Sequence, residues 1–157
     1  MEKFTHMNEE GKAAMVNVSE KKCTLRFAAA RSLVSLPPLV LEKLKSDGMQ
    51  THKGSVLHSA IIAGIMAAKK TGELIPLCHP IGLENCDITI HFNEQNELAI
   101  DCTASVTAKT GVEMEALVGA SIAALTVYDM CKSISHDIVI KEIKLIQKTG
   151  GKNDFKR

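Results

Sequence analysis

The segment LCHP at residues 77–80 places a thiol beside an imidazole. The imidazole of His79 exchanges protons near neutral pH, which suits general acid–base catalysis. A Cys78–His79 pair packed at a turn is the simpler alternative, and half of a metal site is a third. Because no further soft ligands stand at close spacing, we do not expect a metal there.

A second segment, KTGVEME at residues 109–115, places two carboxylates at the expected start of a helix. The helix dipole stabilises Glu113 and Glu115 there, whether or not they have a function. Side chains two positions apart diverge on a helix, so they are not expected to act as a coupled pair. Either carboxylate alone can still meet a ligand, and both interpretations stay open.

The opposite end of the same helix carries YDMCK at residues 128–132. Asp129 and Lys132 are three positions apart, hence on one face, and can form a surface ion pair. An acid near a helix C-terminus opposes the dipole, however, and a local rule broken in this way is a pointer to function. The pair is therefore a candidate for acid–base chemistry.

Cations beside flexible backbone are typical of phosphate sites. Lys53 precedes a glycine, and Lys152 follows two glycines at residues 150–151. Arg26 lies in an expected strand, and its planar guanidinium suits phosphate. The sequence contains no GxxxxGK[ST] pattern, so a Walker A loop is excluded.

Changes of hydrophobic period predict the strands that position these residues. Residues 22–34 are rich in strand-compatible types. Alternation over residues 87–92 and 98–107, separated by a polar turn, predicts an antiparallel hairpin. A last strand is expected over residues 138–146, with a β-bulge near residues 141–142 where the apolar phase shifts.

Helices are expected over residues 38–45, 55–70 and 113–131, with Gly72 as the stop of the second. The third helix has an apolar stripe at helical spacing, typical of a helix packed on a core. The stripe comprises Met114, Leu117, Val118, Ser121, Ile122, Leu125 and Tyr128.

This order of elements predicts an α+β fold, a ferredoxin-like sandwich in which helices pack on one face of an antiparallel sheet. We expect a single domain over residues 1–157, because no linker or repeat divides the chain. Its ends, about residues 1–10 and 149–157, are expected to be flexible or to order with ligand. The other sheet face is polar enough for solvent or a wet subunit interface.

Composition excludes several classes of protein. The net charge is +1, from 19 basic and 18 acidic residues, and there is no Trp and one Tyr, so nucleic acid is not an expected partner. No window approaches the roughly 20 apolar residues of a membrane span. Five scattered cysteines without a CxxC pair indicate reduced thiols and a cytoplasmic protein.

The two ends of the helix over residues 113–131 are too far apart for one small ligand. Glu115 and Asp129 are 14 residues apart, which is roughly 21 Å along a helix. Antiparallel pairing of this helix with its copy in a second subunit would bring opposite ends together. We therefore predict a composite site at a two-fold interface.

At these segments the chain resembles the molybdenum cofactor biosynthesis protein C family, the cyclic pyranopterin monophosphate synthases. The likeness extends over residues 5–151, and the order and spacing of the motifs make it specific. The motifs are THMN (5–8), KG (53–54), GIMAAKK (64–70), LIPLCHP (74–80) and the whole run of residues 109–132, with KTGVEMEAL and YDMCK.

The resemblance implies a ferredoxin-like lyase that acts on (8S)-3′,8-cyclo-7,8-dihydroguanosine triphosphate. The purine's five-membered ring is opened and rebuilt as a pyranopterin, a cyclic phosphate closes and pyrophosphate leaves. The family implies a homohexamer, a trimer of dimers with sites at dimer interfaces. It implies no organic cofactor and no catalytic metal, although magnesium can accompany a triphosphate.

The resemblance also implies roles for the matched residues. Asp129 is the principal catalytic residue with Lys132 as its partner, and Lys53 is a further catalytic candidate. The nucleotide is bound by residues of the two other motifs, and cations face the departing pyrophosphate. The implied substrate-binding residues are Leu77, Cys78, His79, Met114, Glu115 and Glu113, then Arg26, Lys69 and Lys152.

Three positions near the expected site depart from the family pattern. Asn17 and Ser55 replace expected aspartates, and Ala14 replaces a histidine. Two other classes of protein also fit the fold, since a fold does not fix a function. A non-catalytic oligomeric nucleotide-binding module would bind without turnover, and a purely structural oligomer would bind no ligand.

Overall fold

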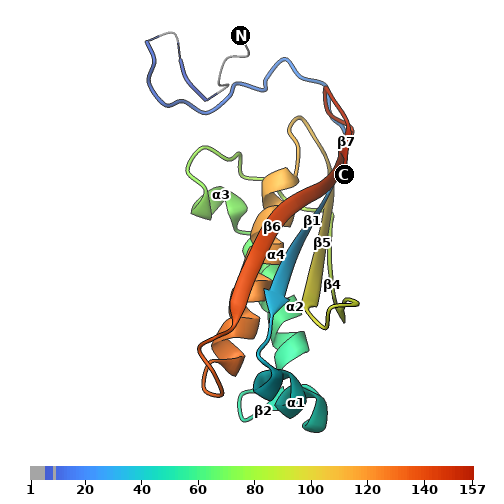
Figure 1. Cartoon of the computed structure of the whole chain (residues 1–157). Helices are drawn as coiled ribbons and strands as arrows, with labels where there is room; N and C mark the ends of the chain where they lie inside the picture. The colour runs from blue at the N-terminus through green and yellow to red at the C-terminus, as the bar shows by residue number, and fades with distance from the viewer. Residues whose placement is uncertain (1–5, 9) are drawn as a thin grey trace.

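The alternating segments form an antiparallel sheet, seen in Figure 1 as strands side by side against the helices. This is a computed structural model, and it describes residues 6–8 and 10–157. Each neighbouring pair in the main sheet is antiparallel, with the order β4-β5-β1-β6-β7. Its strands are β1 (Thr24–Ser35), β4 (Asn85–Phe92), β5 (Leu98–Ala108), β6 (Val139–Thr149) and β7 (Phe155–Lys156).

Two long helices, α2 and α4, pack together and against one face of this sheet (Figure 1). The succession β1-α2-β4-β5-α4-β6, with β1 between β5 and β6, is the ferredoxin-like arrangement, so the predicted fold class is confirmed. A small hairpin of β2 (Gln50–Thr51) and β3 (Gly54–Ser55) precedes α2. The helices are α1 (Pro38–Ser46), α2 (Val56–Ala68), α3 (Thr71–Leu74) and α4 (Glu113–Cys131).

Small residues let α4 pack closely on its neighbours. A Cβ on Gly64 of α2 would lie 2.7 Å from the carbonyl oxygen of Gly119 in α4, so only glycine fits this crossing. Ala28 and Ala30 of β1 are buried on the helix side of the sheet. These alanines weaken the strand pattern in the sequence, yet their size is what the close approach of a helix requires.

The predicted apolar stripe of α4 only partly coincides with the buried face of the helix, since Leu117 and Tyr128 pack against the core without being fully buried. Among its members Val118 is buried, whereas Leu125 is 52% exposed and the others lie between these extremes. Close packing selects small side chains, so the pattern of large residues marks a neighbouring face. The buried face comprises Glu115, Ala116, Val118, Gly119, Ala120, Ala123, Ala124, Val127, Met130 and Cys131.

The register of the strands confirms the predicted hairpin and bulge. β4 pairs with β5 along its whole length. In β6, Glu142 pairs with Leu33 and Ile140 with Val34, so Lys141 between them is the extra residue of a bulge. A second irregularity at Ile146, which the sequence analysis does not predict, shifts the end of β6.

Gly72 does not end the second helix as predicted. α2 ends at Ala68, and Gly72 lies inside the short helix α3. A Cβ on Gly72 would lie 3.0 Å from Cα of Pro80, so the glycine lets the following loop pack against α3. The glycine therefore serves a close contact instead of a helix C-cap.

The C-terminal segment turns back at Gly150, whose φ of 84° favours glycine. The hydroxyl of Thr24 donates to the Gly150 carbonyl at 2.7 Å, and β7 then pairs with β6. Residues 150–157 thus have a defined path here, and their flexibility without ligand stays a prediction. Residues 1–5 and 9 of the predicted flexible start, including Thr5 of the THMN motif, lie outside the described residues.

Helix α4 differs from the expectation that no segment resembles a membrane span. Within the part of the chain that the structure describes, α4 is long and apolar enough to cross a membrane by length and composition. However, 56% of its apolar window is buried in the fold. Burial of this extent is typical of the core helix of a folded domain.

Candidate active site

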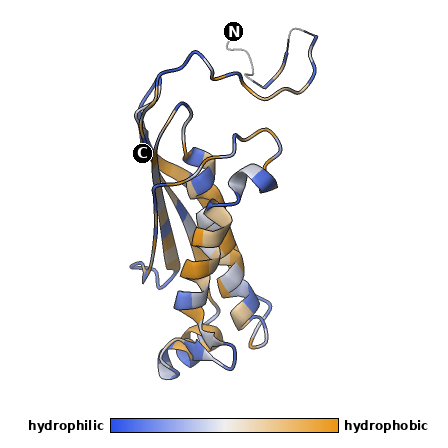
Figure 2. Ribbon diagram, turned by 180° about the vertical axis from the view of Figure 1, so that it is seen from behind, coloured by the Kyte–Doolittle hydropathy of each residue, from blue (hydrophilic) through white to orange (hydrophobic). Residues whose placement is uncertain are grey.

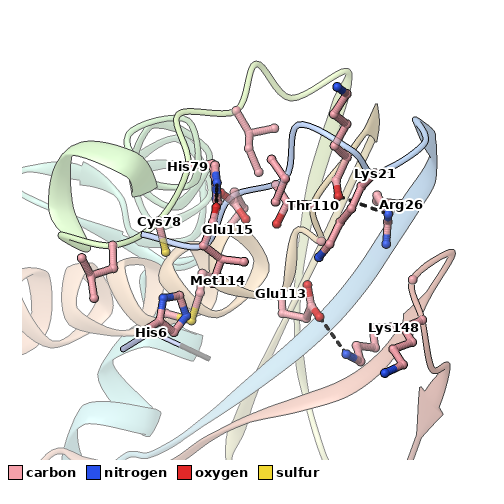
Figure 3. A pocket seen from close by; sticks show the side chains of 18 of the residues that line it. His6, Lys21, Arg26, Cys78, His79, Thr110, Glu113, Met114, Glu115 and Lys148 are labelled. Carbon is pink, nitrogen blue, oxygen red and sulfur yellow. Dashed lines mark hydrogen bonds and ion pairs between the residues drawn. The ribbon is translucent and has the colours of Figure 1, made fainter. Parts of the chain in front are cut away.

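A cavity of about 460 Å³ lies where α4 and β1 begin and β6 ends (Figure 3). Loop residues 77–81 form one wall, and the segment that leads into β1 forms another. The cavity brings together eight residues that the sequence analysis assigns to substrate binding. They are Arg26, Leu77, Cys78, His79, Glu113, Met114, Glu115 and Lys152.

The start of α4 presents its two carboxylates to different surroundings. Glu115 is 3% exposed, and this burial, with the nearby charge of Glu113, raises the pKa of its carboxyl group. Cys78 lines the same cavity, where burial and then the charge of Glu115 raise the pKa of its thiol. Glu115 is thus suited to hold a proton at a higher pH than an exposed carboxyl.

Two hydrogen bonds hold the N-terminal segment over the cavity. Nε2 of His79 lies 2.8 Å from the carbonyl oxygen of Val16, which requires the proton to be on Nε2. Nζ of Lys109 donates to the carbonyl oxygen of Ser19 at 2.7 Å. Lys21 of this segment consequently lines the cavity (Figure 3).

Cations outnumber carboxylates in the lining. Arg26 is fixed by its Nε and Nη2, which donate to the carbonyl oxygens of Ala108 and Lys109 at 3.3 Å each. Glu113 and Glu115 oppose five cations, so the cavity is suited to an anionic ligand. The cations are Lys21, Arg26, Lys109, Lys148 and Lys152.

The opposite end of α4 carries a second charged cluster. Lys132 Nζ lies 2.7 Å from Oδ1 of Asp129, which confirms the predicted i,i+3 ion pair. Lys53, in the β2–β3 turn, lies 3.0 Å from Oδ2 of the same carboxylate. Bonds from Lys132 and Lys53 lower the pKa of Asp129 to about 2, and Asp129 raises the pKa of Lys132.

The predicted catalytic trio therefore assembles, but away from the cavity. None of Lys53, Asp129 and Lys132 is among the cavity-lining residues of the described chain. Lys69 also lies apart, in a smaller hollow beside α3 that includes Gly72 and Pro80. One protomer thus presents two separate groups of predicted site residues.

Several lining residues are absent from the sequence-based site. Lys21 stands beside one other lysine, and Lys148 follows two spaced lysines in the same strand, so nothing in their local sequence distinguishes them. Lys109 and Thr110 stand in the KTG segment, whose glycine and cation are a usable signal. The additional lining residues are His6, Val16, Val18, Lys21, Ile81, Lys109, Thr110, Gly111, Lys148, Thr149 and Gly151.

Two of the positions expected to depart from the family pattern have local structural roles. Asn17 accepts a hydrogen bond from the backbone of Ser19 at 2.9 Å, and Ser55 caps α2 by accepting from His58 N at 3.4 Å. Aspartate, asparagine and serine all serve in such turns and caps. The replacements of aspartate therefore keep these contacts possible.

The chain is similar to curated proteins over almost its whole length. Cyclic pyranopterin monophosphate synthases of Brevibacillus brevis and Clostridium acetobutylicum are each 49% identical to the chain, over 99% of it and 97% of their own lengths. The synthase of Xanthomonas campestris pv. campestris (strain B100) is 47% identical over 98% of the chain and 93% of its own length. The model of the MoaC family matches residues 15–151. The chain therefore belongs to the MoaC family.

Proposed function

We propose that this protein is a cyclic pyranopterin monophosphate synthase, a phosphorus–oxygen lyase of molybdenum cofactor biosynthesis. Its substrate is (8S)-3′,8-cyclo-7,8-dihydroguanosine 5′-triphosphate, and its products are cyclic pyranopterin monophosphate and pyrophosphate. The observation that carries this proposal is the cavity in which the LCHP and KTGVEME segments meet five cations. Such a lining offers proton carriers and an anion site to one ligand.

Within the cavity we assign the triphosphate to Arg26 and Lys152, joined by Lys21, Lys109 and Lys148. Cations aimed at the departing oxygens stabilise the charge that develops as pyrophosphate leaves. The purine-derived rings are assigned to the loop over residues 77–79 and to the start of α4. Leu77, Cys78, His79, Met114 and Glu115 supply that wall.

We assign ring rearrangement to Asp129 with Lys132 and Lys53. A pKa of about 2 makes Asp129 a carboxylate at neutral pH, so it begins the reaction as a proton acceptor or as an electrostatic partner. Lys132, whose pKa is raised, is protonated and can donate. The remaining residue, Lys53, stabilises the carboxylate from the other side.

We infer that the two groups of residues meet between subunits. The separation of Glu115 and Asp129, roughly 21 Å along α4, exceeds the reach of one small ligand within a protomer. Large apolar side chains on α2 and α4 support a second copy as the partner: Ile62 is 59%, Met66 53% and Leu125 52% exposed. Figure 2 shows hydrophobic residues along both helices. We extend this to a hexamer built as a trimer of dimers.

For its surroundings we propose the cytoplasm, without membrane or nucleic-acid partners and without a resident cofactor or metal. The free thiols of all five cysteines support a reducing compartment. The near-neutral total charge, +1, supports a small anion as ligand instead of a nucleic acid.

The test is incubation of the purified protein with the cyclised dihydro-GTP substrate, followed by mass spectrometry of pyranopterin and pyrophosphate. Native protein should release both products, while Asp129→Asn and Lys132→Ala should assemble normally and lose activity by roughly a hundredfold or more. Binding without product in the native protein would contradict the proposed activity and favour the nucleotide-binding module.

A further inference from the structure

An ion pair occupies part of the anion-binding wall of the cavity. Oε1 of Glu113 lies 3.0 Å from Nζ of Lys148, and both side chains line the cavity (Figure 3). The two side chains are only 29% and 35% exposed, so solvent screens the pair incompletely. A carboxylate thus stands where an incoming phosphate would meet Lys148.

Gly111 provides the space for this carboxylate. A Cβ on Gly111 would lie 2.7 Å from Cδ and 2.9 Å from Oε1 of Glu113, and it would also clash with Oε2. The side chain of Glu113 is therefore folded over the bare Cα of Gly111. Gly111 is not among the residues with positive φ, so its backbone conformation does not itself require glycine.

We propose that Glu113 is a placeholder for phosphate: it pairs with Lys148 in the empty cavity and is displaced by an incoming polyphosphate. Gly111 is then a positioning residue, because the absence of a Cβ there leaves room for the Glu113 carboxylate in its observed place. This inference rests on the proposed function, which supplies the polyphosphate ligand. The proposal therefore predicts that Glu113 lowers the affinity of the cavity for anions.

The placeholder has a consequence for turnover. A weakly charged anion gains little from Lys148 because it must displace a carboxylate, whereas a triphosphate brings enough charge to do so. When pyrophosphate leaves, Glu113 can return to Lys148 and hinder rebinding. The ion pair therefore favours highly charged ligands and the release of a less charged product.

A purely structural tie between α4 and β6 is the competing explanation of the same contact. A structural tie predicts that Glu113→Gln lowers thermal stability and leaves anion affinity unchanged. Partly exposed ion pairs contribute little to stability. The placeholder therefore predicts that Glu113→Gln leaves thermal stability nearly unchanged and raises the affinity for anions. Affinity for anions distinguishes the two explanations.

The experiment measures binding of inorganic triphosphate and of pyrophosphate by titration calorimetry at low and high salt. Glu113→Gln removes the charge, and Gly111→Ala keeps the charge but removes its place. Both should bind triphosphate roughly three- to tenfold more tightly than native protein at low salt, with the gain shrinking as salt rises. Circular dichroism and thermal melts confirm that each variant folds.

Matched controls separate this effect from a general change of charge. Glu142→Gln removes a similar pair on the same strand, Glu142–Lys144 at 2.6 Å, outside the cavity. Gly82→Ala adds a methyl group where no atom lies within 4 Å of the new Cβ. Both controls should bind triphosphate as native protein does.

The proposal is overturned if Glu113→Gln binds triphosphate no better than native protein, or if Gly111→Ala fails to reproduce its gain. In a Lys148→Ala background, Glu113→Gln should lose most of its advantage, because the paired cation is gone. Since inorganic triphosphate undergoes no ring chemistry, these measurements stand apart from turnover. Absence of pyranopterin synthesis would defeat the proposed function and leave this binding result readable.

Discussion

The two ends of α4 carry charged groups of very different kinds. At its start, Glu115 is 3% exposed and Arg26 is held by two backbone carbonyls. At its end, the side chains of Lys53, Asp129 and Lys132 are 43%, 53% and 47% exposed. The first group lines a cavity, whereas the second group lies open to solvent.

This difference bears on where chemistry can take place. Electrostatic catalysis depends on exclusion of water, because solvent weakens every interaction between charges. The exposed cluster around Asp129 therefore lacks the exclusion of water that the cavity provides. The cavity, in turn, lacks a strongly ionised acid–base pair. A second subunit that covers the cluster with its cavity would complete both.

The largest expected effect tests whether the two ends of α4 from different subunits form one site. The test changes one end in one chain and the other end in a second chain. His79→Ala in one chain and Asp129→Asn in another should each reduce synthase activity by roughly a hundredfold or more. Mixed dimers carry one site with both changes and one intact site. Mixed dimers should therefore have about half of native activity, and an unsorted equal mixture about a quarter.

The measurement is pyranopterin formation by co-expressed, differently tagged chains purified through both tags. A matched control mixes His79→Ala with Glu115→Gln, two changes at the same end, which should restore nothing. Absence of recovery in the test pair would show that each protomer carries a site of its own. Recovery in the control would show instead that His79 and Glu115 of one chain serve different sites.

A smaller effect tests why Asp129 is ionised. Lys132→Ala removes the larger cause of its lowered pKa, so the pKa of Asp129 should rise from about 2 toward its ordinary value of 3.8. The acid limb of the pH–activity profile should then move to higher pH, and Lys132→Arg should keep it near its native position. Carboxyl NMR of Asp129 measures the pKa directly.

The thermal stability of Lys132→Ala tests whether the Asp129–Lys132 pair stabilises the fold. The cluster is exposed, and exposed ion pairs contribute little, so Lys132→Ala should leave the Tm at pH 7 nearly unchanged. A large loss of Tm would mean that Asp129 and Lys132 hold the fold together. The contrast between the enclosed cavity and the exposed cluster proposed for catalysis would then fail.

Periodicity in the sequence predicts the elements of this fold well, and their packing faces less well. Residues 113–131 are a helix as expected, but the predicted stripe only partly faces the core: Leu117 and Tyr128 pack against it, whereas Leu125 is exposed. Hydrophobicity alone does not tell a core face from a subunit face. Steric fit decides here, because Gly64 and Gly119 let two helices approach more closely than large side chains allow.

The sequence likewise predicts some residues of the candidate site and not others. Local motifs predict the residues that stand together in the chain, such as Cys78 with His79 and Asp129 with Lys132. Lys148 enters the cavity because it pairs with Ala28 of β1, a register that depends on the irregularity at Ile146. One residue more or less in β6 would turn that side chain to the other face of the sheet. Such register is a property of the assembled sheet and has no local signal.

The smallest expected effect concerns the buried carboxyl at the walled end. Burial raises the pKa of Glu115 above its ordinary value of 4.5, so the native state binds its proton more tightly than the unfolded state does. Stability is thus fully present below the ordinary pKa and falls as pH rises through the raised native pKa. Glu115→Gln removes this cost and should raise the Tm at pH 7 by roughly 2–4 °C.

Near pH 4 the advantage of Glu115→Gln should disappear, since Glu115 is then largely protonated in both states. Melting curves from pH 4 to 8, beside Glu142→Gln as a partly exposed control outside the cavity, measure this trend. Substrate binding should weaken in Glu115→Gln although the fold is more stable, which is the pattern of a carboxylate kept for a ligand at a cost in stability. An equal Tm for native and variant protein at every pH would mean that the cavity hydrates Glu115 as freely as solvent hydrates Asp129, and the two ends of α4 would no longer differ in kind.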